Sequence, residues 1–360
     1  MHVTEMLFER AVTALGPLDR ARGVVLSFGA RAARPLLRDR GLRVLVLASL
    51  SVVLAFAGAW LFPLAVLALG PVLLGVPHLL SDVRYLVARP GLHRRAAFWA
   101  LVVLPLGVVY SRPEVWVGLL CAIGAALIAR TTAWRKVIAV VVLGALAAWV
   151  HGHRGVAEIW MAHAHNIVAL VMWTLFFRAR SAGSPVGRRR HLGVALLFAL
   201  LGTLLFVMPL RQTAESFAGL TLDVQLRSLS PVVDPQLSLR FVLFFAFAQS
   251  VHYAVWLRAV PEEARNRAGI RSFASTARAL QKDVGPWLLA AFALVFVGIA
   301  AWALSDLVAA RTGYLRLAIA HAYLEIAVAT LFILERRSTS TSTSTSPLTL
   351  EPDQLGLERG

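Results

Sequence analysis

The chain has 360 residues, 58% of them hydrophobic, and a formal net charge of +17 at pH 7. Its mean hydropathy of +0.71 is far above that of a soluble domain. The arginines lie between apolar runs and not on one soluble face, so the charge does not indicate a nucleic-acid partner. The single cysteine, Cys121, cannot form an intrachain disulfide. Composition therefore predicts an all-α, polytopic membrane protein.

The first segment, residues 1–43, carries eight arginines among short apolar clusters. This pattern predicts one or two amphipathic helices that lie on anionic lipids of the inner leaflet. A solvated basic tail is the alternative interpretation. The first long apolar run begins after this segment, so we do not expect a cleavable signal peptide.

Residues 44–335 form the predicted transmembrane domain. Apolar runs of about 18 or more residues are candidates for helices that cross a bilayer. The pattern predicts about ten spans, near 44–61, 63–82, 97–111, 114–129, 137–152, 156–177, 192–210, 239–257, 286–306 and 314–334.

The distribution of basic residues gives this bundle an orientation. With the N-terminus inside, the inner segments hold 29 of the 36 Lys and Arg residues, and the outer segments hold 7. Positive residues collect on the cytoplasmic side of membrane proteins. We therefore expect both termini to be cytoplasmic and the protein to lie in the inner (plasma) membrane of the cell.

Three segments connect or follow these spans. Residues 211–238 form a long outer loop that either caps the bundle or only connects two spans. Residues 258–285 form a cytoplasmic loop in which Pro261-Glu262-Glu263 is expected to open an amphipathic surface helix. The tail, residues 336–360, contains a Ser-Thr repeat and is predicted to be disordered.

Four apolar spans carry a histidine together with a polar residue on the same helical face. Residues three, four or seven positions apart share a face. Metal-bound histidines usually donate their second ring N–H to a carboxylate, a carbonyl or water. These pairs predict a shared metal site, and the alternative is a set of polar contacts that join the helices. The pairs are His78–Asp82, Glu158–His165, Gln249–His252 and His321–Glu325.

The predicted ligands are His78, His165, His252 and His321, with Asp82, Glu158 and Glu325 as the carboxylates of the site. His163 and His165 are about 200° apart around a helix, so only one of them can point to the centre. We choose His165, because its face also carries a carboxylate and small residues, and keep His163 in reserve.

The other five histidines are expected to lie outside the site. Three of them fall in basic segments where solvated side chains are expected, and two flank a glycine at the outer membrane boundary. The solvated group is His2, His93 and His191, and the boundary pair is His151 and His153.

The segment Gly75-Val76-Pro77-His78, with Asp82 four residues later, resembles the Pro-His-Gly-x-x-Asp signature of the Brp/Blh family of membrane β-carotene 15,15′-dioxygenases. Leu79 stands where that family has glycine. The Phe247-x-Gln249-Ser250-x-His252 segment and His321 are similar to its later histidine positions. The resemblance implies one non-haem iron held by histidines of several helices, and oxidative cleavage of a long conjugated substrate.

The residues themselves allow more than one chemistry. Neutral imidazoles with a nearby carboxylate suit Fe(II), Zn or Cu, and an apolar site favours a small-molecule substrate from the lipid phase, such as a carotenoid. A b-type haem between His165 and His252 is an alternative. A transporter or proton-coupled carrier is another, because buried His–carboxylate pairs can relay protons.

Overall fold

The computed structural model describes residues 3–28, 35–36, 38–177, 185–265 and 271–336. Within these residues almost all of the secondary structure is helical. The predicted all-α class is therefore confirmed. The predicted disordered tail lies outside the described residues, apart from Arg336 at the end of the last helix.

Eight helices of the described chain are long and apolar enough to cross a membrane. Two of them are built from consecutive segments that change helical type without ending the helix. α5 runs on through the π-helical segment η1, and α13 runs on through the π-helical segment η5 and then α14. In chain order, the segments that make up the eight helices are α4 (Arg40–Leu61), α5 (Pro63–Asp82), η1 (Val83–Ala88), α9 (Ala133–Gly152), α10 (Arg154–Phe176), α11 (Pro185–Val207), α13 (Pro235–Ala254), η5 (Val255–Ala259), α14 (Val260–Glu263), α16 (Pro286–Ser305) and α17 (Leu307–Arg336).

Two shorter apolar helices form a hairpin where the sequence predicts the third and fourth spans. The first comprises α6 (Ala96–Phe98), the π-helical segment η3 (Trp99–Val103) and α7 (Leu104–Ser111), after the 3₁₀ turn η2 (Leu92–Arg94). The second is α8 (Val115–Ile128). At 14 residues α8 is about 21 Å long, shorter than the hydrocarbon core of a typical bilayer. Each of the ten predicted spans thus has a helix, and eight of them reach spanning length.

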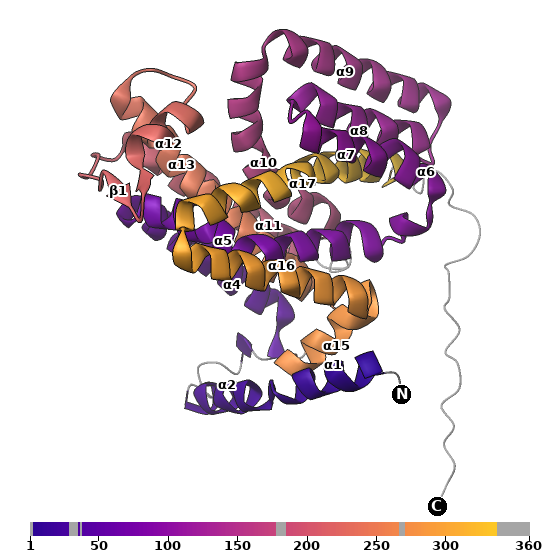
Figure 1. Cartoon of the computed structure of the whole chain (residues 1–360), viewed down its shortest axis with the longest axis vertical. Coiled ribbons are helices and arrows are strands. Elements are labelled where there is room, and N and C mark those ends of the chain that lie inside the picture. Colours follow the sequence, from indigo (N-terminus) through magenta and orange to yellow (C-terminus); the bar gives the residue numbers. More distant parts are fainter. Residues whose placement is uncertain (1–2, 29–34, 37, 178–184, 266–270, 337–360) are drawn as a thin grey trace, which may run out of the picture.

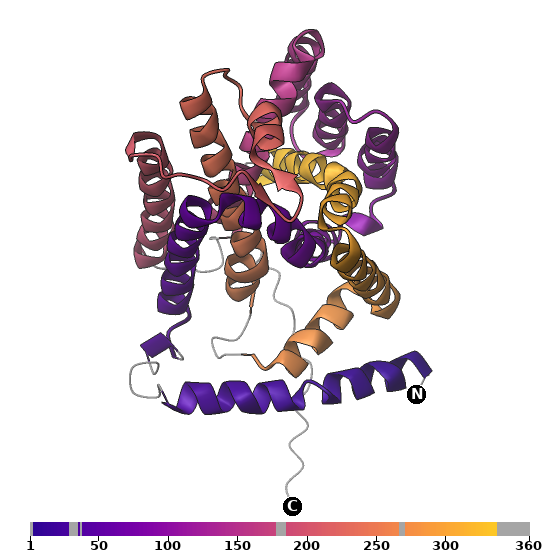
Figure 2. The ribbon, with the colours of Figure 1, turned by 60° about the vertical axis from the view of Figure 1, so that its left-hand side comes forward.

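The two ends of the bundle have different coverings (Figures 1 and 2). One end carries a small hairpin, β1 (Ser216–Phe217) and β2 (Leu220–Thr221), followed by α12 (Leu222–Leu229). At the other end α1 (Val3–Thr13) and α2 (Gly16–Phe28) run across the long helices, beside α15 (Phe273–Val284). The predicted outer loop and the predicted cytoplasmic segments therefore lie at opposite ends.

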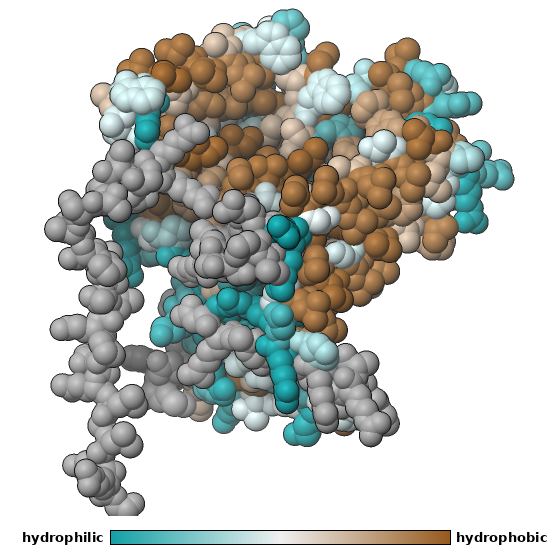
Figure 3. All heavy atoms as spheres, turned by 180° about the vertical axis from the view of Figure 1, so that it is seen from behind, coloured by the Kyte–Doolittle hydropathy of each residue, from teal (hydrophilic) through white to brown (hydrophobic). Residues whose placement is uncertain are grey.

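Apolar side chains cover the outside of the bundle. Val141 on α9 is 63% exposed and Leu294 on α16 is 74% exposed. Seen from behind, hydrophobic residues dominate the middle of the upper part of the molecule, and hydrophilic residues gather below it, toward the end that carries α1 and α2, and at the right-hand edge (Figure 3). A large exposed apolar surface of this kind is what lipid contact requires.

The outer loop caps one end of the bundle, which decides between its two predicted roles. Gln225 and Leu229 of α12 are buried against the long helices. The Leu229 carbonyl lies 2.8 Å from His163 Nε2 on α10, and Gln225 Oε1 lies 3.4 Å from Arg311 Nη2 on α17. α12 is thus attached to two separate helices.

Buried ion pairs tie the opposite end together and correct two predictions. Glu262 and Glu263 are each 4% exposed and extend the α13 helix, so they do not open a surface helix. Glu262 pairs with Arg43 of α4, with 2.5 Å between Oε1 and Nη2. His191 of α11, expected to be solvated, is 3% exposed and lies 2.7 Å from Glu263 Oε1. The polar neighbours of these residues come from helices distant in sequence, which a local pattern does not report.

The amphipathic helix of the cytoplasmic loop is α15, and polar contacts attach it to both the N-terminal helices and the bundle. Asp19 of α2 accepts hydrogen bonds from the backbone N–H groups of Phe273 and Ala274 at its first turn. At its last turn Asp283 lies 2.6 Å from Arg84 Nη2. Burial raises the pKa of Asp283, but hydrogen bonds and charge from Arg84 and Arg89 outweigh burial and hold that pKa below its ordinary value.

Candidate metal centre

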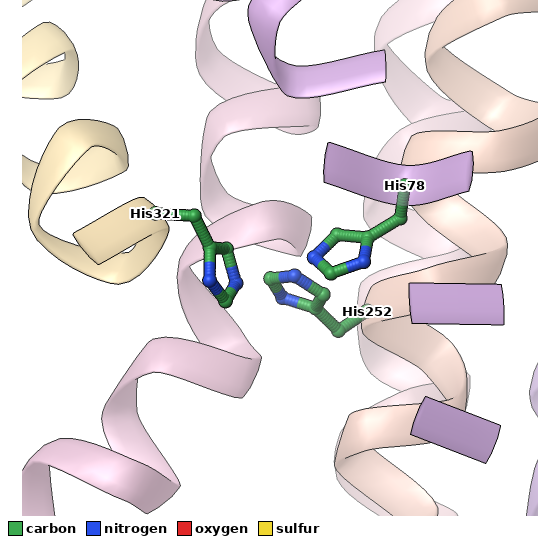
Figure 4. A group of neighbouring side chains, drawn as sticks. All are labelled: His78, His252 and His321. Carbon is green, nitrogen blue, oxygen red and sulfur yellow. The ribbon is translucent and has the colours of Figure 1, made fainter. Parts of the chain in front are cut away.

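Four histidines from four helices meet inside the bundle. His78 comes from α5, His165 from α10, His252 from α13 and His321 from α17. We call them the four-histidine cluster. The ring centroids of neighbours are 4.8 Å (His78–His321), 5.3 Å (His78–His252), 4.5 Å (His165–His252) and 4.6 Å (His165–His321) apart. Figure 4 shows three of these rings gathered around one point.

Backbone carbonyls fix the protonation of two members of the cluster. His78 Nδ1 lies 2.6 Å from the Gly75 carbonyl oxygen, and His321 Nδ1 is bonded to the Ala318 carbonyl in the same way. A carbonyl only accepts, so each Nδ1 carries the hydrogen. Each Nε2 is then an acceptor, and neither has a hydrogen-bond partner among the described residues. Two buried lone pairs are left for another ligand.

Glu325 connects the other two histidines. Its Oε2 lies 3.2 Å from His165 Nδ1, and its Oε1 lies 3.6 Å from His252 Nε2. The Trp256 indole N–H donates to Oε1 at 2.6 Å, which fixes the orientation of the carboxylate. A carboxylate on one ring nitrogen of a histidine leaves the other nitrogen for a metal. His252 is 1% exposed, and neither of its ring nitrogens has a hydrogen-bond partner among the described residues.

A second carboxylate, Asp82, lies beside the cluster. It is 1% exposed, and its Oδ2 is 3.7 Å from His78 Nε2. Neither carboxyl oxygen of Asp82 has a hydrogen-bond partner in the described part of the chain. Asp82 and Glu325, when ionised, place two negative charges beside neutral imidazoles in an apolar interior. One divalent cation in the cluster would balance both charges, and without it their burial is costly.

A glycine makes the close approach of α5 and α17 possible at the cluster. A Cβ on Gly75 would lie 2.2 Å from the Tyr314 ring, so any larger residue would displace that tyrosine. The Tyr314 hydroxyl is 3.3 Å from His78 Nδ1. Gly75 thus supplies both the carbonyl that orients His78 and the space that its aromatic neighbour needs.

The donor set fits a small transition-metal ion. Ligand atoms of His78, His252 and His321 lie within 4.8 Å of one another, as do those of His165, His252 and Glu325. Metal–nitrogen bonds of about 2.0–2.1 Å place two ligands on opposite sides of one ion about 4 Å apart. Imidazoles with a carboxylate suit Fe, Zn or Cu.

The same distances do not favour a haem between His165 and His252. Two axial nitrogens that share one iron lie about 4 Å apart, and each ring centre lies further out by about one ring radius. The centroids of these two rings are only 4.5 Å apart. The space between them is therefore too small for a porphyrin.

Several histidines lie away from the cluster. His163 is buried among Phe241, Phe244 and Phe245 and bonds the Leu229 carbonyl, so it joins the outer cap to the bundle. The choice of His165 over His163 thus agrees with the positions of the two side chains. His151 and His153 stay at the helix boundary, where they are exposed, and His93 is exposed as predicted. His2 lies outside the described residues.

Two predicted pairs are replaced by contacts between helices. Glu325 was expected to pair with His321 on its own helix, but its oxygens face His165 and His252. Glu158 was expected to support His165, but it is exposed at the far end of a pocket, two turns away along α10. Trp256 and Tyr314 were missed, although their spacing of four and seven residues from His252 and His321 places each on a histidine-bearing face.

A pocket leads from the cluster toward the outer end of the bundle. Its volume is about 440 Å³, within the usual range for small-molecule sites. His165, His252 and His321 line its inner end, and Pro113 and Glu158 line its exposed end. Its walls between these ends are mainly apolar and aromatic, and come from α10, α13 and α17.

No family model, no curated protein and no solved structure matches this chain.

Proposed function

We propose that this protein is a membrane oxygenase that holds one non-haem Fe(II) on the four-histidine cluster and acts on an apolar lipid-phase substrate such as a carotenoid. The observation that carries the proposal is the convergence of His78, His165, His252 and His321 from four helices, with free Nε2 atoms on His78 and His321. Fe(II) with open coordination positions supplies O2 chemistry beside a bound substrate.

The chain contributes ligation, orientation and exclusion of water. Glu325 places a carboxylate oxygen 3.2 Å from His165 Nδ1 and is itself held by the Trp256 indole. Gly75 and Ala318 hold the tautomers of His78 and His321 through their carbonyls. The mainly apolar walls of the pocket offer a conjugated chain a path to the cluster.

The proposed reaction balances without a further reductant. One O2 is divided over the two carbons of one double bond, which breaks that C=C bond and forms two C=O groups. The resemblance of the Gly75–Asp82 segment to the Brp/Blh signature supports this choice among iron-dependent oxidations.

The test is expression of the full chain in a carotenoid-accumulating host. Wild-type protein should bleach the cells and release an aldehyde. Replacement of His78 or His165 by alanine should abolish bleaching, because each removes a predicted metal ligand. The exposed His93→Ala change is the control and should leave bleaching intact. Persistent colour with folded, iron-loaded wild type would overturn the carotenoid assignment, and damage from His93→Ala equal to that from His78→Ala would overturn the site.

A further inference from the structure

The pocket that ends at the four-histidine cluster has a carboxylate at its opposite, exposed end. Glu158 and Pro113 line this exposed end, which we call the rim. Glu158 precedes His165 by seven residues on α10, which separates the two by about 10 Å along the helix. A molecule that fills the pocket therefore has one end near the histidines and the other near a negative charge.

Glu158 has no ion pair within the described chain that would neutralise it. The nearest candidate on its own helix is Arg154, one turn earlier, but Arg154 Nη1 lies 3.2 Å from Glu114 Oε2. Arg154 also contacts the His151 side chain. Arg154 is thus engaged by Glu114, and Glu158 lines the exposed end of the pocket without an ion pair among the described residues.

The inner end of the pocket is polar as well. Gln249 lines the pocket and is 6% exposed, and its buried Oε1 has no hydrogen-bond partner among the described residues. Asn166, 4% exposed, lies in the same wall. Between these amides and the rim the walls are apolar, with residues such as Met161, Leu315 and Ile319.

The volume limits the length of the occupant. At about 30 Å³ per water-sized group, 440 Å³ holds roughly fifteen such groups. This corresponds to an apolar chain of about fifteen carbons or to one end of a longer molecule.

We infer that the pocket selects an elongated apolar molecule whose end group is neutral or cationic, such as an isoprenoid alcohol or hydrocarbon, and rejects fatty acids and other anionic lipids through Glu158. The inference names the substrate class of the proposed enzyme and rests on the proposed function. A charge placed against the wrong ligand is an efficient means of discrimination, and a bilayer contains anionic lipids that the pocket would otherwise admit.

Three probes with the same fifteen-carbon chain test this selection: farnesol, farnesylamine and farnesoic acid. Each is added to the purified, metal-loaded protein in a maltoside detergent at pH 7.5, and affinity is taken from the rise in thermal midpoint with probe concentration. The alcohol and the amine should bind at least about tenfold more tightly than the acid. Glu158→Gln should bring the acid to within about threefold of the alcohol.

A matched pair of alanine variants tests the location. Ala162 lines the pocket on α10, whereas Ala164 is exposed and is not among the pocket-lining residues. Ala162→Phe should weaken binding of all tight-binding probes by at least about tenfold with its metal content unchanged, and Ala164→Phe should bind as the wild type does.

Binding of the acid as tightly as the alcohol by the wild type, or unchanged binding by Ala162→Phe, would overturn the inference. Failure of all three probes to bind would overturn it as well. None of these results requires turnover, and metal content is measured on the same samples. Loss of the proposed function through absence of metal is therefore distinguishable from failure of the selection.

Discussion

At the scale of single residues, neighbours on the same or another helix position three of the four histidines of the cluster, His78, His321 and His165. Gly75 does this for His78 through a carbonyl of the same helix, which the sequence pattern can suggest. Glu325 does it for His165 from another helix, which the pattern cannot suggest. The sequence therefore indicated the histidines and the His78–Asp82 pair within one helix. It erred on the carboxylate partners of His165 and His321, because a periodic pattern contains only contacts within one helix.

His191 shows the same limit outside the membrane interior and gives a residue-scale prediction. It lies in an arginine-rich segment but is buried against Glu263 and Trp173. His191→Ala should destabilise the protein by about 3 kcal/mol, because it leaves the Glu263 carboxylate buried without this partner. The measurement is the midpoint of thermal or denaturant unfolding in detergent. His93→Ala, at an exposed position, should leave the midpoint unchanged; an equal effect of both changes would contradict the role of His191.

At the scale of elements, close contacts between helices position the site. The α7–α8 hairpin packs against α17, and Gly124 lies where α8 approaches the backbone of its neighbour η3. A Cβ on Gly124 would lie 1.8 Å from the Leu101 carbonyl oxygen, which belongs to the backbone and cannot rotate away. Hydropathy predicts the two short spans. The close contact between α8 and η3, however, depends on the path of η3, which the periodicity of the sequence does not report.

Gly124→Ala should therefore separate α8 from η3 and lower stability by about 1–3 kcal/mol through overpacking. Gly144→Ala on α9 is the control, because a Cβ there meets nothing within 4 Å. That change should be neutral or slightly stabilising, since alanine is the better helix former. Unfolding midpoints of both variants in one detergent decide the matter, and equal midpoints would show that α8 can move without cost.

At the scale of the whole molecule, the fold class and the positions of the helices follow from composition and from the length of the apolar runs. Which helix packs beside which does not follow from them, because a hydropathy pattern does not distinguish one apolar helix face from another. Polar residues inside the spans did indicate which helices meet at the site, because polar side chains in an apolar interior are expected to face one another. The loop that carries α12 and the loop that carries α15, predicted on opposite sides of the membrane, also lie at opposite ends of the bundle.

Topology is the whole-molecule prediction that follows from the 29-to-7 division of basic residues. A reporter fused after residue 360 should score as cytoplasmic, and one inserted in residues 212–236 should score as external. A reporter pair with complementary activity on the two sides of the membrane provides the measurement. The opposite pattern would contradict the orientation, and the same side for both would contradict the number of crossings between them.

The central claim is that the four-histidine cluster holds a metal ion, and metal content per chain tests it most directly. Elemental analysis of the purified protein should find about one equivalent of a transition metal, with iron expected. Replacement of His252 by alanine should weaken metal binding by more than the 10–100-fold typical of a residue that only orients a ligand. His93→Ala should retain the full equivalent. A folded, active protein that carries no metal would contradict the claim, as would a His252→Ala protein with undiminished metal.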